Sequence, residues 1–165
     1  KLVEVSKQPR FLGKIIFLPD YDMEIAEMLV QGVDLWLNTP VRGLEASGTS
    51  GMKAMLNGVL NFSVLDGWWI EGFNGKNGWA FGHEEMNGNR DQADAEAIFG
   101  ILEEEILPLY YDRNERGVPR GWVARMKNAL QSLAWRFNAD RMVMNYAREF
   151  YLPAVGGVAS DLDGR

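Results

Sequence analysis

Residues 44–53, LEASGTSGMK, are the segment whose residue types are best suited to bind a ligand or take part in a reaction. In this segment small residues precede a lysine. It follows a predicted strand and opens a predicted helix, the position at which parallel α/β folds bind their ligands. Glycines let a ligand approach the backbone closely, and the N–H groups at a helix N-terminus favour a phosphate or another anion. The hydroxyls and the amine add further donors. The sequence therefore predicts an anion site formed by Gly48, Thr49, Ser50, Gly51 and Lys53.

This segment is not a Walker A loop. That motif has four residues between its first glycine and the Gly-Lys pair, whereas here two residues separate Gly48 from Gly51 and Met52 precedes Lys53. A plain helix N-cap is the open alternative, because Ser and Thr are common at such positions. A positive lysine in the first turn of a helix interacts unfavourably with the positive end of the helix dipole. This small energetic cost suggests that the lysine is there for a functional reason.

The elements that would hold this segment follow from short apolar runs and helical spacing. Strands are predicted for residues 14–18, 33–37 and 59–64, and helices for residues 22–31 and 51–57. This order, with short connections, is typical of right-handed parallel β/α units, so the predicted class is α/β, a partial Rossmann-like parallel sheet with flanking helices. Three strands are fewer than a free-standing doubly wound sheet has. The sequence also starts at Lys1 without an initiator methionine, so we expect a fragment whose missing strands precede Lys1.

The second half of the chain is predicted to be irregular at first and then helical. Residues 67–90 are rich in Gly, Trp and Asn and are expected to form a long ordered loop. Helices are predicted for residues 91–111, with an end or kink at Pro108, and for residues 119–137 and 138–151. The middle helix has a core stripe of Trp122, Met126, Ala129, Leu133 and Phe137. The expected divisions are a β/α half-domain (1–66), this loop (67–90), a helical portion (91–155) and a flexible tail (156–165).

Composition excludes several classes of protein. The 165 residues carry a net charge of −6, so no overall basic field attracts nucleic acid. There is no cysteine, which rules out disulfides and thiolate metal sites, and no metal-ligand spacing appears elsewhere. No apolar run approaches the length of a membrane span and no signal peptide is visible. These features fit a cytoplasmic protein.

The order of residues around the lysine resembles a known family. EASGTSGMKAMLNG (residues 45–58), followed by LDGWWIEG (65–72), is similar to the pyridoxal-phosphate segment of α-glucan phosphorylases, above all the shorter prokaryotic forms. IIFLPDYDMEIAE (15–27) and FNADRMVMNYAREFY (137–151) resemble the strand and helix before that segment and the family's closing helix. The resemblance implies reversible phosphorolysis of α-1,4-glucan to glucose 1-phosphate. It also implies the C-terminal domain of a two-domain GT-B glycosyltransferase fold.

The same resemblance implies roles for individual residues. The lysine at the Lys53 position forms a Schiff base with pyridoxal 5'-phosphate, which anchors the cofactor, while the cofactor phosphate faces the substrate phosphate. Cofactor-binding positions match Lys53, Thr49, Gly48, Gly51 and Tyr21. Positions that bind the glucosyl unit match Glu45, Ser47 and Gly48.

Two departures from the family pattern affect what the chain is expected to do. Asp22 stands where many members carry an arginine that pairs with phosphate, so either another cation serves or phosphate binding differs. The N-terminal domain and the upstream lysines of the family's active site are absent. The chain alone is therefore expected to be inactive toward α-glucan and inorganic phosphate, and its uncovered apolar surface is expected to favour a homo-oligomer.

Two rival functions stay open at this point. A nucleotide-sugar glycosyltransferase, such as a glycogen or starch synthase, shares the architecture but lacks the lysine that Lys53 matches. A non-catalytic subdomain that binds an anion or a partner is the other rival.

Several other residues are expected to be structural. His83 is the only histidine, and Glu103, Glu104 and Glu105 form a solvated charge run on a helix. Packing of the tryptophans at 68, 69 and 79 against a missing domain is preferred over stacking on a sugar ring. Asp66 is expected to have a structural role at a turn.

Overall fold

A computed structural model describes residues 1–82 and 90–157, so the expectation for His83 lies outside the described residues. Its centre is a parallel sheet in the order β1 (Leu35–Asn38), β2 (Leu60–Val64) and β3 (Gly78–Phe81). Leu35 pairs with Leu60, and Asn61 pairs with Gly78. Every residue of β2 is buried, as expected for the central strand of a parallel sheet covered on both faces. The predicted α/β class is confirmed.

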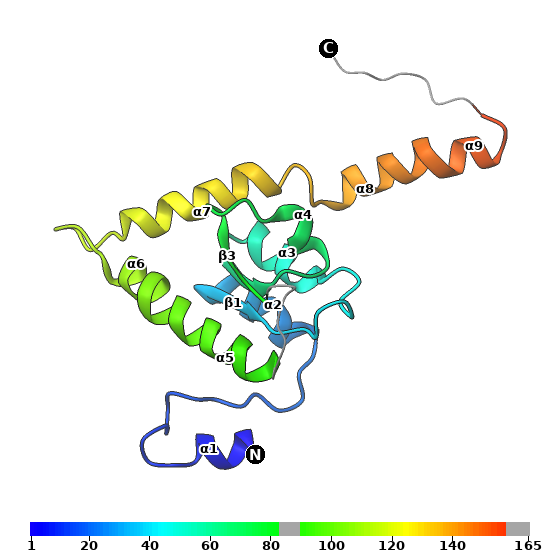
Figure 1. Ribbon diagram of the computed structural model, residues 1–165. Coiled ribbons are helices and arrows are strands. Elements are labelled where there is room, and N and C mark those ends of the chain that lie inside the picture. Colours follow the sequence, from blue (N-terminus) through cyan, green and yellow to red (C-terminus); the bar gives the residue numbers. More distant parts are fainter. Residues whose placement is uncertain (83–89, 158–165) are drawn as a thin grey trace.

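Two helices, α2 (Met23–Gly32) and α3 (Thr49–Leu56), lie beside the sheet as the sequence predicted. The carboxylate of Asp22 caps α2 by accepting a hydrogen bond from the Ile25 N–H at 2.9 Å. Helix α3 contacts β1, β2 and α2 (Figure 1). The side-chain amide of Asn61 on β2 donates to the Gly51 carbonyl at 3.0 Å, which ties α3 to the centre of the sheet.

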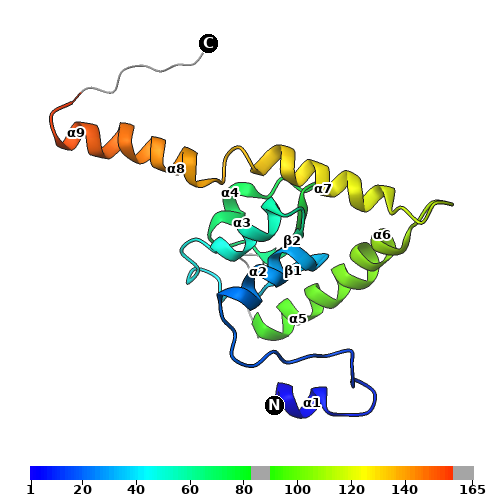
Figure 2. The ribbon, with the colours of Figure 1, turned by 180° about the vertical axis from the view of Figure 1, so that it is seen from behind.

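The helical second half covers the rest of the sheet. Helix α5 (Arg90–Ile101) contacts β3, and α7 (Arg120–Leu133) contacts β2, β3 and α3, as Figures 1 and 2 show. The predicted stripe on α7 is confirmed. Trp122, Ala129, Leu133 and the following Phe137 are buried, and Met126 packs against the same cluster.

Pro108 and Pro153 each follow a π-helical turn. Residues Leu102–Ile106 (η1) separate α5 from α6 (Leu107–Tyr111), which contains Pro108. In the same way Ala147–Tyr151 (η2) separates α8 (Ala139–Tyr146) from α9 (Leu152–Ala154). Proline has no N–H and its ring crowds the carbonyl four residues earlier, so the hydrogen-bonding pattern widens there. Pro108 therefore alters the helix but does not end it.

Two predictions of secondary structure were wrong. Residues 14–18 form no strand, and Ile16 is 73% exposed. A strand needs a neighbour for its backbone groups, and this run has none in the described structure. The segment expected to be an irregular loop contains α4 (Trp68–Gly72) and β3. Strand β3 is only four residues long and begins with a glycine, so its sequence carries a weak strand signal.

The three tryptophans of this region form part of the chain's own core, so neither packing against a missing domain nor a sugar platform describes them. Trp68, Trp69 and Trp79 are at most 4% exposed. The indole N–H of Trp69 donates to the Trp79 carbonyl at 3.1 Å, and that of Trp79 donates to Glu105 at 3.1 Å. Burial of large aromatic surface stabilises this half of the sheet.

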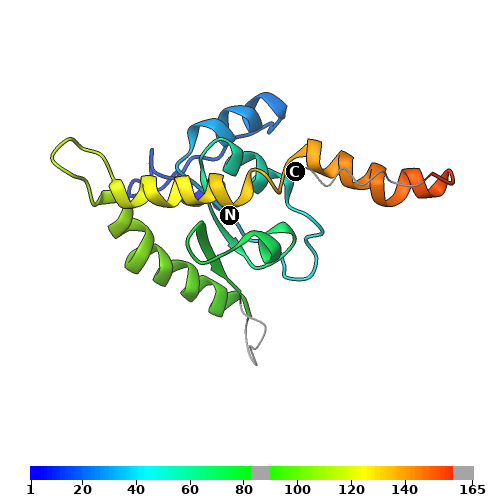
Figure 3. The same cartoon turned by 90° about the horizontal axis from the view of Figure 1, so that it is seen from above.

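The first and the last described helices lie away from this core. Helix α1 (Leu2–Ser6) and the segment after it run along one side, and α8 to α9 projects beyond the sheet (Figures 1 and 3). Asn138 caps α8 by accepting from the Arg141 N–H at 2.8 Å, so this predicted helix start is confirmed. Among the described residues, no helix has the length and apolar character needed to span a bilayer.

Candidate functional site

The site is built on the loop that connects β1 to α3. Gly48 is the N-cap of α3 and has φ +86° and ψ +52°, a left-handed conformation that favours glycine. The preceding Ser47 carbonyl accepts from the Trp68 N–H at 2.8 Å. A Cβ on Gly67 would lie 2.5 Å from that carbonyl oxygen, so the loop and the start of α4 are in close backbone contact. Helix α4, whose two tryptophans are buried in the core, therefore holds the loop in place.

Asp66 is the second anchor of the loop. One carboxylate oxygen accepts from the Gly43 N–H at 2.8 Å and the Glu45 N–H at 3.0 Å, and the other accepts from the Gly67 N–H at 2.9 Å. Burial alone would raise the pKa of Asp66, but these three donors and the charge of Arg42 together lower it below its ordinary value. Its expected structural role at the turn agrees with this geometry.

The core packing around Gly51 leaves no room for a side chain. This glycine is buried, and a Cβ there would lie 2.6 Å from Asn61 Oδ1 and 2.9 Å from Trp68 Nε1. Its N–H donates to the Gly48 carbonyl at 3.2 Å. Core packing therefore requires the glycine at position 51.

Helix α3 begins two residues earlier than the sequence predicted, so Lys53 lies in its second turn. Thr49 and Ser50 are four and three residues before Lys53, the spacings that place side chains on one helix face. Lys53 is exposed. Within residues 1–82 and 90–157, no protein acceptor or acid is bonded to its ammonium group. The amine is therefore available to a ligand that approaches this face.

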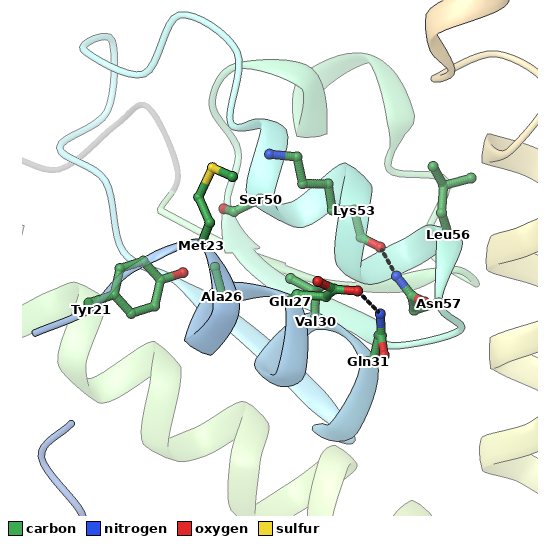
Figure 4. A pocket seen from close by; sticks show the side chains of 10 residues that line it. All are labelled: Tyr21, Met23, Ala26, Glu27, Val30, Gln31, Ser50, Lys53, Leu56 and Asn57. Carbon is green, nitrogen blue, oxygen red and sulfur yellow. Dashed lines mark hydrogen bonds between the residues drawn. The ribbon is translucent and has the colours of Figure 1, made fainter.

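A cavity of about 430 Å³ separates α3 from α2, and Lys53 lies on its wall. Figure 4 shows Lys53 and Ser50 of α3 on one side and Tyr21, Met23 and Glu27 on the other. Gln31 donates to Glu27 at 3.2 Å, and the Asn57 side chain donates to the Lys53 carbonyl at 2.9 Å. Both hydrogen bonds hold one end of the cavity in place.

A second hollow of about 340 Å³ lies on the other side of Lys53, between α3 and the start of α8. Ser47 and Thr49 line this hollow, whereas Tyr21 and Ser50 line the first one. Lys53 and Leu56 line both, so these two side chains form the ridge between them.

The remaining predicted site residues lie outside both hollows. Neither Gly48 nor Gly51 lines them, and Glu45 is exposed on the loop above. The structure thus brings Lys53 together with Tyr21 on one side and with Ser47 and Thr49 on the other.

Sequence reasoning missed some residues that line these two hollows. One helical face of α2 forms the wall opposite Lys53, and its members are Met23, Ala26, Glu27 and Val30. Their spacing of three or four residues was visible in the sequence and could have identified this face. Arg141, which lines the second hollow, had no such local signal because it lies 88 positions after Lys53.

Comparisons with known proteins agree with the residue pattern. A sequence model of the family described as carbohydrate phosphorylase matches residues 2–108. A glycogen phosphorylase of Aquifex aeolicus is 56% identical over 92% of this chain and 22% of its own length. A maltodextrin phosphorylase of Thermococcus litoralis is 49% identical over 94% of this chain, and a glycogen phosphorylase of Mycobacterium bovis 46% identical over 93%, each over 18% of its own length.

The chain therefore spans about a fifth of the length of the curated relatives it matches. Both the family match, which extends over more than half of the residues, and the high identity across nearly the whole chain lead to the same assignment. This chain belongs to the carbohydrate phosphorylase family.

Proposed function

We propose that this chain is the cofactor-holding part of an α-glucan phosphorylase, which cleaves α-1,4-glucan with inorganic phosphate to glucose 1-phosphate in a reversible, retaining transfer. The observation that carries the proposal is the position of Lys53. Its amine has no partner among the described residues and lies on the wall between two hollows, one helical turn from the start of α3. The printed names of the relatives, glycogen and maltodextrin phosphorylase, support the substrate class. The sheet would belong to the C-terminal domain of a GT-B fold.

The residues around Lys53 fit pyridoxal 5'-phosphate. The 430 Å³ cavity lies in the range of small-molecule sites, about 300–1,000 Å³. Its α2 wall presents Met23, Ala26 and Val30 to a flat ring, and Tyr21 stands at its edge. When bound, the cofactor supplies an aldehyde that a lysine can hold covalently and a phosphate group that acts in phosphoryl chemistry.

The chain's own residues would bind and orient these groups. The N–H groups of Thr49 and Ser50 open α3 and have no acceptor within the described part of the chain, so they are free to donate to a phosphate. The Thr49 hydroxyl is a further donor. Glu45 and Ser47 lie on the loop that Asp66 fixes, where a carboxylate and a hydroxyl can bond to sugar hydroxyls.

Asp22 does not take the place of the family's cation. Its carboxylate accepts the Ile25 N–H and caps α2, so it already has a structural function. Phosphate binding in this protein would therefore depend on other positive groups.

The test uses the full-length protein reconstituted with pyridoxal phosphate and reduced with borohydride. Peptide mapping should find the pyridoxyl group on Lys53, and Lys53→Ala should abolish the label. Lys76→Ala is the matched control, because Lys76 is also exposed but lines a different hollow. Failure to find a pyridoxyl adduct on Lys53 would favour a synthase-type glycosyltransferase.

The missing part of the protein would complete the site. The isolated chain should release no glucose 1-phosphate from glycogen or maltodextrin, although it should still bind the cofactor phosphate weakly. Measurable phosphorolysis by the isolated chain would contradict this division of roles.

A further inference from the structure

We propose that Asp66 and Gly67 are positioning residues for sugar recognition. They hold the backbone of the loop formed by residues 43–47 so that the side chains of Glu45 and Ser47 meet particular sugar hydroxyls. The inference rests on the proposed function, which assigns the binding of the glucosyl unit to these two side chains. Neither Asp66 nor Gly67 would touch the sugar, and yet both would decide which sugars the protein accepts.

The contacts that hold the loop fall on every second residue. One carboxylate oxygen of Asp66 accepts from the N–H groups of Gly43 and Glu45 at 2.8 and 3.0 Å. The N–H of Trp68 donates to the Ser47 carbonyl at 2.8 Å. Both Asp66 and Trp68 are buried, so their own positions are fixed by the core. The loop backbone is therefore held at three points along its length.

The side chains of Glu45 and Ser47 stay available to a ligand. Both residues are exposed, and within residues 1–82 and 90–157 neither the carboxylate of Glu45 nor the hydroxyl of Ser47 has a hydrogen-bond partner. A carboxylate and a hydroxyl can bond to sugar hydroxyls, and such hydrogen bonds weaken steeply with poor distance or angle. A displacement of the loop backbone would therefore impair recognition of the hydroxyls that these two side chains meet.

Gly67 brings the two segments closer than a side chain would allow. Its φ is +52°, in the region that favours glycine. A Cβ there would lie 2.5 Å from the Ser47 carbonyl oxygen and 3.1 Å from that of Glu45. Gly75 also has a positive φ, +80°, but a Cβ on it would meet open space. An alanine at either position strains the backbone, whereas only the one at 67 pushes the loop away.

The loop is also tied to the end of β3. The guanidinium of Arg42 donates to the Gly82 carbonyl, and the Leu65 N–H donates to the Phe81 carbonyl at 3.1 Å. The segments after all three strands are thus joined at the carboxyl edge of the sheet, where parallel α/β folds bind their ligands. Since β2 is the buried central strand, loss of a contact would move the loop rather than the segment after β2.

The first measurement compares Gly67→Ala with Gly75→Ala in the full-length protein. The probes are glucose 1-phosphate and its deoxy analogues, each of which lacks one hydroxyl. In the wild type, removal of a hydroxyl that Glu45 or Ser47 recognises should lower kcat/KM about 10- to 100-fold. Gly67→Ala should lower kcat/KM for glucose 1-phosphate by a similar factor and leave it nearly unchanged for that analogue. Gly75→Ala should discriminate between the two as the wild type does.

Asp66→Asn tests the same positioning without added bulk, and Asn77→Ala is its control. Asn77 is also buried, donates to the Gly72 carbonyl at 2.8 Å and accepts from the Asn74 N–H at 3.1 Å. It precedes β3, so it lies at the amino edge of the sheet. Both variants should lose stability through broken buried hydrogen bonds, but only Asp66→Asn should discriminate less among the deoxy sugars.

A purely structural role would lower kcat/KM by the same factor for every sugar. The proposal is therefore refuted if folded Gly67→Ala or Asp66→Asn protein keeps the wild-type ratios of kcat/KM between glucose 1-phosphate and all its analogues. With Lys53 labelled by borohydride and phosphorolysis intact, that result overturns the present inference alone. A wild-type protein with neither the label nor phosphorolysis refutes the proposed function and this inference with it.

Discussion

Replacement of Asp66 by asparagine tests how the site loop is held. In the wild type one carboxylate oxygen accepts two loop N–H groups, from Gly43 and Glu45, and the other accepts the Gly67 N–H. An asparagine can keep its oxygen toward the first pair only by turning its NH₂ group toward Gly67. At least one charge-assisted hydrogen bond is therefore lost, and the other two become neutral.

The cost follows from these bonds. A hydrogen bond to a charged group contributes about 1.5–3 kcal/mol, so Asp66→Asn should lower the free energy of unfolding by about that amount at neutral pH. Asp34→Asn is the control. Asp34 is exposed and accepts one bond, from the Tyr110 hydroxyl at 3.1 Å, which an asparagine can still accept. The free energy of unfolding of Asp34→Asn should differ from that of the wild type by no more than about 0.5 kcal/mol.

The pH dependence provides a sharper assay. The folded-state pKa of Asp66 is lowered, so its stabilising contribution is fully present above the unfolded-state value, about 3.9, and is lost as pH falls through the lower folded value. Asparagine does not titrate. Urea unfolding followed by tryptophan fluorescence should show a constant difference in free energy of unfolding between the wild type and Asp66→Asn from about pH 7 to about pH 5. This difference should be smaller at about pH 3.

Two results would refute this reasoning. One is a difference in free energy of unfolding that persists or grows at low pH, which would mean that the charge of Asp66 does not stabilise the folded loop. The other is a loss of unfolding free energy in Asp66→Asn that is no larger than the loss in Asp34→Asn.

Two further predictions concern α3 and α8. Gly51→Ala should lower the free energy of unfolding by about 1–3 kcal/mol, because the new Cβ would lie 2.6 Å from Asn61 Oδ1. Gly100→Ala in α5 is the control, because a Cβ there would meet open space. It should be neutral or stabilising by up to about 1 kcal/mol. Equal effects in thermal unfolding would contradict the packing argument. Asn138→Ala should cost about 0.5–2 kcal/mol through the lost cap of α8, measured by urea unfolding, and Asn138→Ser should recover much of that loss; no difference between the two would exclude a capping role.

The sequence alone determined the features that depend on neighbours along the chain. The helix after residue 22, the cap at Asn138, the stripe of α7 and strands β1 and β2 follow from local pattern, and each has its predicted place. The segment around Lys53 was sufficient to indicate the family, because the order of many residues is specific even without a structure.

Tertiary structure decided what depends on residues far apart in the chain. Only the packing of Gly51 against Asn61 and Trp68 shows that this glycine makes room for the core, and only the register with β2 makes residues 78–81 a strand. Likewise, Arg141 lies beside Lys53 because α7 turns back over α3 before α8 begins. Local propensity contains no information about such contacts, since they arise when distant apolar faces are buried together.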